Sequence, residues 1–285
     1  MDRIPVRHIS ATQKEPDTTA LFNIWALDEL LAGTDMVQEL HRHDFFYILA
    51  LKNGSGHHDI DFTHYQICDN TIFFMRPGQV HQLVLKAGST GYLMQFSAGF
   101  YFLNDKAADH VLRKAGSINH YRPGDKGFQK LFNSLAYILQ EYTDRHLYYQ
   151  ETIRANMDIF FIGLIRLQPA NAVSSASMHT QAQLEKLLTL LDTHVFTHKQ
   201  VAYYADMLNL SAYQLNIITT TTLGKTCSQV INEHIVLEAK RYLLATANQV
   251  NQIAGLLGYQ DASYFIRFFK KHTGHSPEAF RHNFS

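Results

Sequence analysis

The segment from Val250 to Pro277 constrains the fold of this chain more than any other, because two helical apolar patterns follow one another there. The first pattern recurs at i, i+3, i+4 and i+7 and stops at a glycine: Val250, Ile253, Ala254, Leu257 and then Gly258. This spacing places the four apolar side chains on one face of a short helix, and the glycine marks its end. A turn and a second helix follow, so the segment predicts a helix-turn-helix.

The second helix of this segment has one aromatic face and one polar face. The residues expected to be buried are Tyr264, Phe265, Phe268 and Phe269, and those expected on the opposite face are Ser263, Ile266, Arg267 and Lys270. Asp261 is placed to cap the start of this helix, and Gly274 with Pro277 is expected to end it. Periodicity alone does not distinguish a helix that enters a DNA groove from an ordinary amphipathic helix pair with a solvated basic edge.

The order of short motifs in this segment resembles the signature of the AraC/XylS family of bacterial transcription regulators. The matching pieces are Ile253-Ala254, Gly258-Tyr259, Ser263 to Lys270 and Gly274 to Pro277. The resemblance implies a C-terminal all-α domain with two helix-turn-helix units that binds double-stranded DNA. It also implies an N-terminal sensor domain for a small-molecule effector, with a second copy of the chain and RNA polymerase as further partners.

Arg267 is the first candidate for reading bases, because a guanidinium group can donate two hydrogen bonds to guanine, one to O6 and one to N7. Ser263 and Ala262 lie one turn earlier and are expected to touch base edges or a thymine methyl group. Three further basic residues are assigned to phosphates, which position a protein without reading sequence: Lys270, Lys271 and Arg281. The alternative for Arg267 is a surface ion pair.

A degenerate copy of the same pattern precedes this segment. Val201, Ala205 and Leu208 repeat the first stripe, and Ser211 is the expected N-cap of the following helix. The buried face of that helix is predicted to be Leu215, Ile218, Thr219 and Thr222, ending at Gly224. Its outward face is predicted to be Tyr213, Asn216, Ile217 and Thr220.

This first unit departs from the family pattern, because its outward face lacks the Arg or Lys that relatives carry and Thr219 replaces a core Phe. Asn216 is still expected to pair with adenine, but the unit is predicted to bind DNA more weakly, through shape or apolar contacts. Residues 228 to 247 predict one long helix between the copies. A rigid spacer of this kind is expected to set the two reading helices in successive major grooves, about 34 Å apart.

The N-terminal half predicts an all-β domain with flanking helices. Residues 21 to 97 alternate in the strand manner and are interrupted by glycine-rich and Pro-Gly turns, which favours a jelly-roll barrel. Two helices are expected afterwards, one over residues 128 to 142 and one over residues 148 to 167. They carry more apolar surface than a barrel flank needs, so we assign the excess to a homodimer contact.

Two histidine-containing stretches in this half, His41-Arg-His43 and Arg76 to His81, resemble the motifs of the cupin barrel. In metal-binding cupins, three histidines and a glutamate converge on a transition metal, but Tyr47 occupies the glutamate position here. No metal and no cofactor are therefore expected. The family resemblance makes His41, His43, Tyr47 and His81 candidate residues of an effector pocket, with a purely structural role as the alternative.

Another histidine-containing stretch, residues 56 to 62, also has the composition of a metal site. Strand alternation places Ile60 and Phe62 on one face and Asp59 and Asp61 on the other. A solvated sheet edge is therefore the preferred interpretation of this stretch.

Composition sets the remaining bounds. Residues 168 to 180 are small, polar and aperiodic, which predicts a linker between a sensor domain over residues 1 to 167 and a DNA-binding domain over residues 181 to 285. The formal net charge is zero. Nine Lys/Arg against seven Asp/Glu from Thr180 onward leave +2 there and −2 before it, which implies few phosphate contacts per protomer. Cys68 and Cys227 are the only cysteines and are expected to be core thiols.

The preferred function is a sequence-specific, effector-responsive transcription regulator and not an enzyme. Because the first residues contain several charges and no apolar run, we expect neither a signal peptide nor a membrane partner, and a cytoplasmic location. Two alternatives stay open at this point: a cupin-type metalloenzyme with an appended helical module, and a regulator that has no effector.

Overall fold

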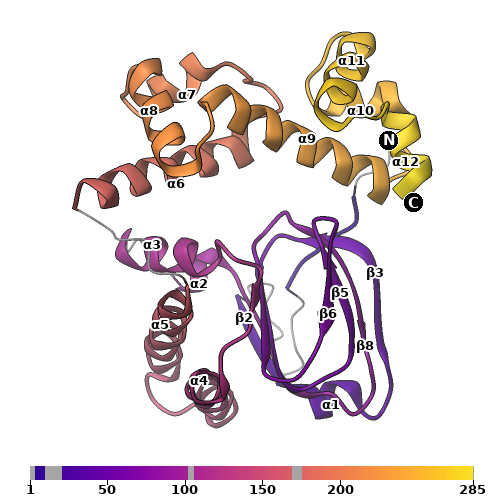
Figure 1. Ribbon diagram of the computed structural model, residues 1–285. Helices are drawn as coiled ribbons and strands as arrows, with labels where there is room; N and C mark the ends of the chain where they lie inside the picture. The colour runs from indigo at the N-terminus through magenta and orange to yellow at the C-terminus, as the bar shows by residue number, and fades with distance from the viewer. Residues whose placement is uncertain (1–3, 10–20, 102–105, 169–174, 285) are drawn as a thin grey trace. The chain divides into compact units, whose positions relative to one another are not determined.

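The computed structural model describes residues 4–9, 21–101, 106–168 and 175–284. The chain divides into two compact units: Pro5–Ala170, and Asn171–Ser285 together with the first four residues. Figure 1 shows strands with flanking helices in the first unit and helices in the second. No helix within the described ranges is long and apolar enough to cross a membrane.

The first unit is a β-sandwich of two five-stranded sheets, with strand orders β1-β3-β8-β5-β6 and β10-β7-β4-β9-β2. Its strands are β1 (Val6–Arg7), β2 (Phe22–Ala26), β3 (Met36–His43), β4 (Phe46–Asn53), β5 (Gly56–Ile60), β6 (Thr63–Ile67), β7 (Thr71–Met75), β8 (Val80–Leu85), β9 (Thr90–Phe96) and β10 (His120–Tyr121). Neighbouring strands pair antiparallel throughout the described residues, apart from the parallel pair β1 and β3. The predicted jelly-roll architecture is confirmed.

Strand β4 is buried on both faces, so it packs against the facing sheet on one side and against the helices on the other. Tyr47, Leu49 and Leu51 point into the core between the sheets, whereas Ile48 and Ala50 point to the outer face, which helices cover. Strict alternation of the backbone divides the side chains in this way, and both faces are apolar. Each fully buried large aliphatic side chain contributes about 1.5–3 kcal/mol.

The helices of this unit are α1 (Leu27–Leu31), α2 (Ala98–Tyr101), α3 (Lys106–Ala115), α4 (Asp125–Asp144) and α5 (Tyr149–Leu167). Helices α4 and α5 match the two predicted helices and cover one sheet, as Figure 1 shows. The residues of the predicted stripe on α4 belong to the core that this helix shares with the sheet and with α5: Phe128, Leu131, Phe132, Leu135, Ile138, Leu139 and Tyr142.

The stretch from residue 56 to 62 differs from its prediction as a solvated sheet edge. β5 lies inside its sheet, between β8 and β6, and His58 is fully buried. Asp61 and Phe62 form the turn of the β5–β6 hairpin, with positive φ angles of 45° and 67°. The Asp61 carboxylate accepts hydrogen bonds from Gln79 and from the backbone N–H of Val80, so it is a structural group of the turn.

The second unit consists of helices built around a long central one. They are α6 (Ser175–His194), α7 (Val201–Met207), α8 (Ala212–Leu223), α9 (Cys227–Ala245), α10 (Val250–Leu256), α11 (Ala262–Thr273) and α12 (Pro277–Phe284). The predicted helix over residues 228 to 247 is confirmed as α9, with α7 and α8 toward one end and α10 and α11 toward the other (Figure 1). Of the predicted linker, residues 175 to 180 belong to α6, and residues 169 to 174 lie outside the described part.

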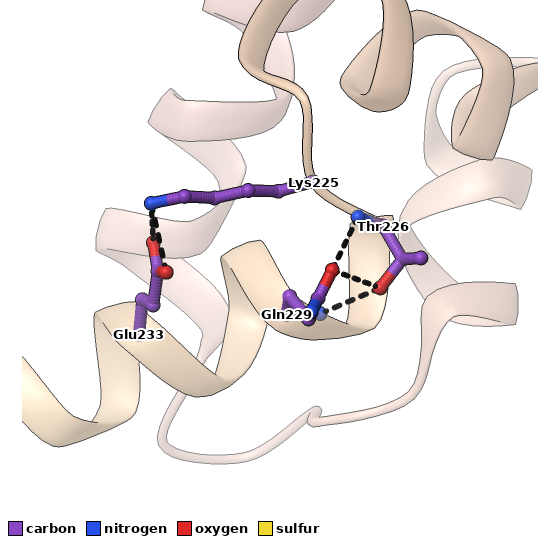
Figure 2. A network of polar contacts seen from close by, with 4 residues as sticks. All are labelled: Lys225, Thr226, Gln229 and Glu233. Carbon is purple, nitrogen blue, oxygen red and sulfur yellow. Dashed lines mark hydrogen bonds and ion pairs between the residues drawn. The ribbon is translucent and has the colours of Figure 1, made fainter. Parts of the chain in front are cut away.

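Side chains fix the starts of α8 and α9, the second helix of the first helix-turn-helix and the long helix that follows it. Ser211 caps α8 and Gln214 bonds back to it, which confirms the predicted cap and completes a capping box. Figure 2 shows the equivalent network at the start of α9, where the Thr226 Oγ1 accepts from the Gln229 N–H and the Gln229 Oε1 accepts from the Thr226 N–H. The nearby ion pair of Lys225 with Glu233, at 2.8 Å, is exposed and adds little stability.

Gly258, in the turn between α10 and α11, has a left-handed backbone conformation and lies close to the backbone of Phe196. Its φ is +73°, and a Cβ atom there would lie 1.7 Å from the backbone oxygen of Phe196. We expect Gly258→Ala to destabilise this unit by about 1–2 kcal/mol through the backbone and by about 1–3 kcal/mol more through the clash. The measurement is hydrogen exchange of the amides in α10 and α11.

Gly274 offers a matched control, since its φ is +81° but a Cβ atom would meet nothing within 4 Å. Gly274→Ala should therefore show the backbone cost alone. Equal effects of the two substitutions would contradict the clash.

Candidate functional site

Helix α11 presents the polar face that its sequence predicts. Ser263, Arg267, Lys270 and Lys271 are exposed and Ala262 is half-buried, while Phe265 and Phe269 are completely buried. Tyr264 was expected on the buried face, but 58% of it is exposed. Its side chain lies beside Tyr259 at the start of the helix, so the exposed surface carries an aromatic ring next to Ser263.

Both ends of α11 are fixed by the predicted residues. The Asp261 carboxylate accepts a 2.7 Å hydrogen bond from the backbone N–H of Ser263, and Gly274 ends the helix in the left-handed conformation. The last turn carries Lys270, Lys271 and His272, where positive charge is favoured by the helix dipole. The donor-rich face of this helix is therefore held in one orientation before any ligand arrives.

Helix α8 exposes a different surface, which is mainly apolar. Tyr213, 75% exposed, and Ile217, 44% exposed, dominate it, together with the hydroxyl of Thr220. Thr219 is fully buried, and its hydroxyl donates to the backbone oxygen of Asn216. This hydrogen bond removes the cost of burying the hydroxyl.

Asn216, expected to pair with adenine, also has a partner within the fold. Its side-chain oxygen accepts a hydrogen bond from the backbone N–H of Cys227, 3.1 Å away, and the residue is half-buried. An amide oxygen has two lone pairs, so this bond occupies one of its two acceptor positions. The Asn216 side chain thereby joins α8 to the first turn of α9.

Arg281 was assigned to phosphate but is also structural. Its guanidinium group donates to the backbone oxygens of Leu243, Thr246 and Asn248, at 2.8, 3.4 and 2.7 Å. These carbonyls belong to the end of α9 and the loop after it, where a cation satisfies acceptors that no helical N–H reaches. Arg281 therefore ties α12 to α9.

The candidate pocket residues of the first unit form one cluster. His41 and His43 point from β3 into the core between the sheets, His81 lies on β8 directly opposite His41, and Tyr47 lies on the facing sheet. An irregularity in β3 between Gln38 and His41 precedes the pair. All four predicted pocket residues are buried and lie together.

The three imidazoles face one another through the same ring atom. The Nε2 of His41 lies 2.9 Å from that of His43 and 3.1 Å from that of His81, and the last two are 3.4 Å apart. The other nitrogen of His41, Nδ1, lies 2.7 Å from the backbone oxygen of Glu39. The three ligand atoms thus converge on one point, in an arrangement suited to a metal ion.

His58 is a fourth member, which the sequence interpretation missed. Its Nε2 lies 2.8 Å from Nδ1 of His81, on the side away from the convergence point. The signal was present in the strand alternation, which places His58 on the same face as buried Ile60. The charged side chains of Asp59 and Asp61 on the same stretch instead favour a solvated edge.

Burial keeps these histidines uncharged. It lowers the pKa of His43 and of His58 to about 3 and lowers the pKa of His41 and His81 as well. Burial also raises the pKa of the Tyr47 hydroxyl, which finds no hydrogen-bond partner within the described ranges. The cluster is therefore neutral near pH 7, the state in which imidazole binds metals or accepts hydrogen bonds.

Comparisons with known proteins also separate a ligand-binding domain from a helix-turn-helix domain in this chain. Residues 32–148 match the family model described as an AraC-like ligand binding domain, and residues 204–283 match a helix-turn-helix domain. The HTH-type transcriptional activator RhaS of Pectobacterium carotovorum subsp. carotovorum is 26% identical over 248 residues, covering 85% of this chain and 87% of that protein. RhaS of Escherichia fergusonii is 24% identical over 243 residues, with coverage of 85% and 86%.

Among solved structures, ToxT from Vibrio cholerae aligns over 92% of this chain and 98% of its own, with 13% identity and a TM-score of 0.43.

The position of Arg281 gives a test that separates structural from DNA-contacting arginines. Hydrogen bonds to charged groups contribute about 1.5–3 kcal/mol, so we expect Arg281→Ala to lower the free energy of unfolding by about that amount. Urea unfolding followed by circular dichroism measures it. Arg267→Ala is the control and should change stability by less than about 0.5 kcal/mol, since Arg267 is exposed. An unaltered stability of Arg281→Ala, with weaker DNA binding, would restore the phosphate role.

Proposed function

The chain belongs to the AraC/XylS family of transcription regulators, and from this premise we propose that α11 supplies most of its base recognition while the β-sandwich binds the effector. The observation that carries the proposal is the exposed donor face of α11, held between the Asp261 cap and the Gly274 terminus. A preorganised helix loses little conformational entropy on entering a groove. The second helix of a helix-turn-helix is the element that reads the major groove.

Individual roles on α11 follow from side-chain chemistry. Arg267 pairs with a guanine through two hydrogen bonds, and Ser263 and Ala262 contact base edges one turn earlier. Lys270 and Lys271 contact phosphates and orient the helix without selecting sequence. Their position in the last turn supports this assignment.

Helix α8 makes the weaker contact. Tyr213 and Ile217 provide exposed apolar surface that suits thymine methyl groups, and Thr220 lies on the same face. The Asn216 oxygen has one acceptor position left for a base, because the other accepts from the N–H of Cys227. Both helices pack against α9, which supports a fixed relation between their contacts in successive grooves.

The active species is a homodimer in the cytoplasm, where its DNA and RNA polymerase are found, and it has no catalytic role. Helix α5 supports the dimer, because Ile159 is 61% exposed and Ile162, one turn later, is 38% exposed. Exposed apolar side chains grouped on one helix are typical of protein interfaces. A second copy of the chain would double the DNA footprint and offset the small excess of positive charge.

The effector contacts His41, His43, Tyr47 and His81. Their burial and mutual proximity support this role, because polar groups that converge inside an apolar core orient a small molecule. Residues 1–167 act as the sensor and residues 181–285 as the reader.

Arg267→Ala tests the assignment of base recognition. We expect a loss of about 1–3 kcal/mol in binding to a selected DNA site, together with relaxed preference at one base pair. Fluorescence anisotropy with the selected site and with single-base variants measures both effects. Tyr213→Ala should cost less, and a larger loss there would reverse the ranking of the two helices.

Lys271→Ala is the matched control for charge, as it removes one positive charge from the same helix. It should weaken binding to all sequences evenly and reduce the salt slope by about one. If Arg267→Ala behaved in the same way, with its sequence preference intact, the base-reading role would be wrong.

Ile159→Asp tests the dimer. A charge in an apolar interface should raise the dimer dissociation constant about 30-fold or more, corresponding to the ~2 kcal/mol of a hot spot. Sedimentation equilibrium of the full chain measures it. Val37→Asp is the control, because Val37 is 67% exposed but lies on β3, away from α5. Identical behaviour of both variants would exclude α5 as the contact.

A further inference from the structure

We propose that the β-sandwich is a metal site, in which one divalent transition-metal ion is bound by the Nε2 atoms of His41, His43 and His81. The sequence favours the opposite conclusion, since Tyr47 replaces the glutamate of metal-binding cupins. The geometry of the three rings outweighs that substitution. The tetrahedral or octahedral environment of such an ion does not require a carboxylate, because three imidazoles are a sufficient protein ligand set.

The nitrogen separations are those expected around a bound ion. They measure 2.9, 3.1 and 3.4 Å for the three pairs of Nε2 atoms. Nitrogen ligands lie about 2.0–2.1 Å from zinc, so ligands at octahedral to tetrahedral angles are roughly 2.9–3.4 Å apart. Each observed separation falls in this range.

Hydrogen bonding among the rings explains this arrangement less well. The Nδ1 of His41 faces a backbone oxygen, which only accepts, so Nδ1 carries the proton and Nε2 offers a lone pair. That single lone pair has two neighbouring imidazole nitrogens, those of His43 and His81. If both donated to it, they would compete for one acceptor. A metal ion instead accepts one lone pair from each ring.

The surroundings of the three imidazole rings favour metal binding. All three are buried, and burial favours the neutral imidazole, which is the form that binds a metal. His58 contacts the far nitrogen of His81 and so sets the orientation of that ring, as residues behind metal-bound histidines generally do. His58 is thus a positioning residue and not a ligand.

The ligand set indicates which ions would bind. Neutral imidazoles suit zinc, copper, iron and nickel better than calcium or magnesium, which prefer oxygen ligands. Three protein ligands leave at least one coordination position open. This last step rests on the proposed function: an oxygen or nitrogen atom of the effector takes that open position.

Titration of the metal-free, untagged full chain with Zn²⁺ in a calorimeter tests the site. We expect one ion per chain, and a reduction in affinity of about 100-fold or more in His81→Asn and in His43→Gln, beyond the effect typical of residues behind the ligands. His58→Phe should lower affinity by about 10- to 100-fold. The double variant His57→Ala/His64→Ala is the control, since it removes a neighbouring histidine pair on the β5–β6 hairpin and should leave that ion bound.

Co²⁺ provides an independent readout, because its visible absorption spectrum reports nitrogen ligation directly. Emission from Trp25, the single tryptophan, which packs beside the core between the sheets, verifies that each variant is folded. A folded wild type that binds neither ion at micromolar concentration overturns the proposal, as does unchanged Zn²⁺ affinity in the folded His81→Asn and His43→Gln variants. Neither titration uses DNA or effector, so their failure would leave the transcriptional role intact.

Discussion

Helix α9 packs against the second helix of both helix-turn-helix units, and hydrogen bonds at its two ends join it to α8 and to α12. At its start, the first N–H group bonds to the Asn216 side chain from α8. At its end, the guanidinium group of Arg281 from α12 donates hydrogen bonds to three backbone oxygens, in the last turn of α9 and in the loop after it. No N–H group within the helix reaches these acceptors. A helix end buried without such partners would lose the free energy of several hydrogen bonds. The orientation of α8 and of α12, on which Phe269 of α11 packs through Phe280, therefore depends on satisfying the end groups of one shared helix.

The same requirement shapes the sensor unit, although the groups involved are side chains. The core between the sheets is built from aliphatic and aromatic residues, yet one sheet contributes four histidines to it. Burying polar rings is costly unless each nitrogen has a partner. Short distances between the rings supply partners for some of these nitrogens, and a metal ion would bind the Nε2 lone pairs of His41, His43 and His81. The histidines proposed to bind effector and metal thus belong to the same core that stabilises the sandwich.

Local patterns in the sequence predict many of the helix faces, caps and helix ends that the structure shows. The apolar stripe of α10, the Ser211 and Asp261 caps and the glycine that ends α11 all act between residues a few positions apart. Arg267 was likewise placed correctly on the exposed face by its spacing alone. Tyr264 was placed wrongly on the buried face. It lies at the edge of a wide apolar stripe, and a residue at such an edge is buried only where a neighbouring element covers it.

The sequence by itself determined the family, the two-part organisation and the faces of most helices and strands, since these follow from short-range periodicity and from motifs at constant spacing. Only the tertiary structure showed the hydrogen-bond partners of Asn216, Arg281 and His58. Each has a partner on another strand or helix, 11 to 38 positions away. A hydrogen bond depends on distance and direction in space, and spacing along the chain carries neither between separate elements.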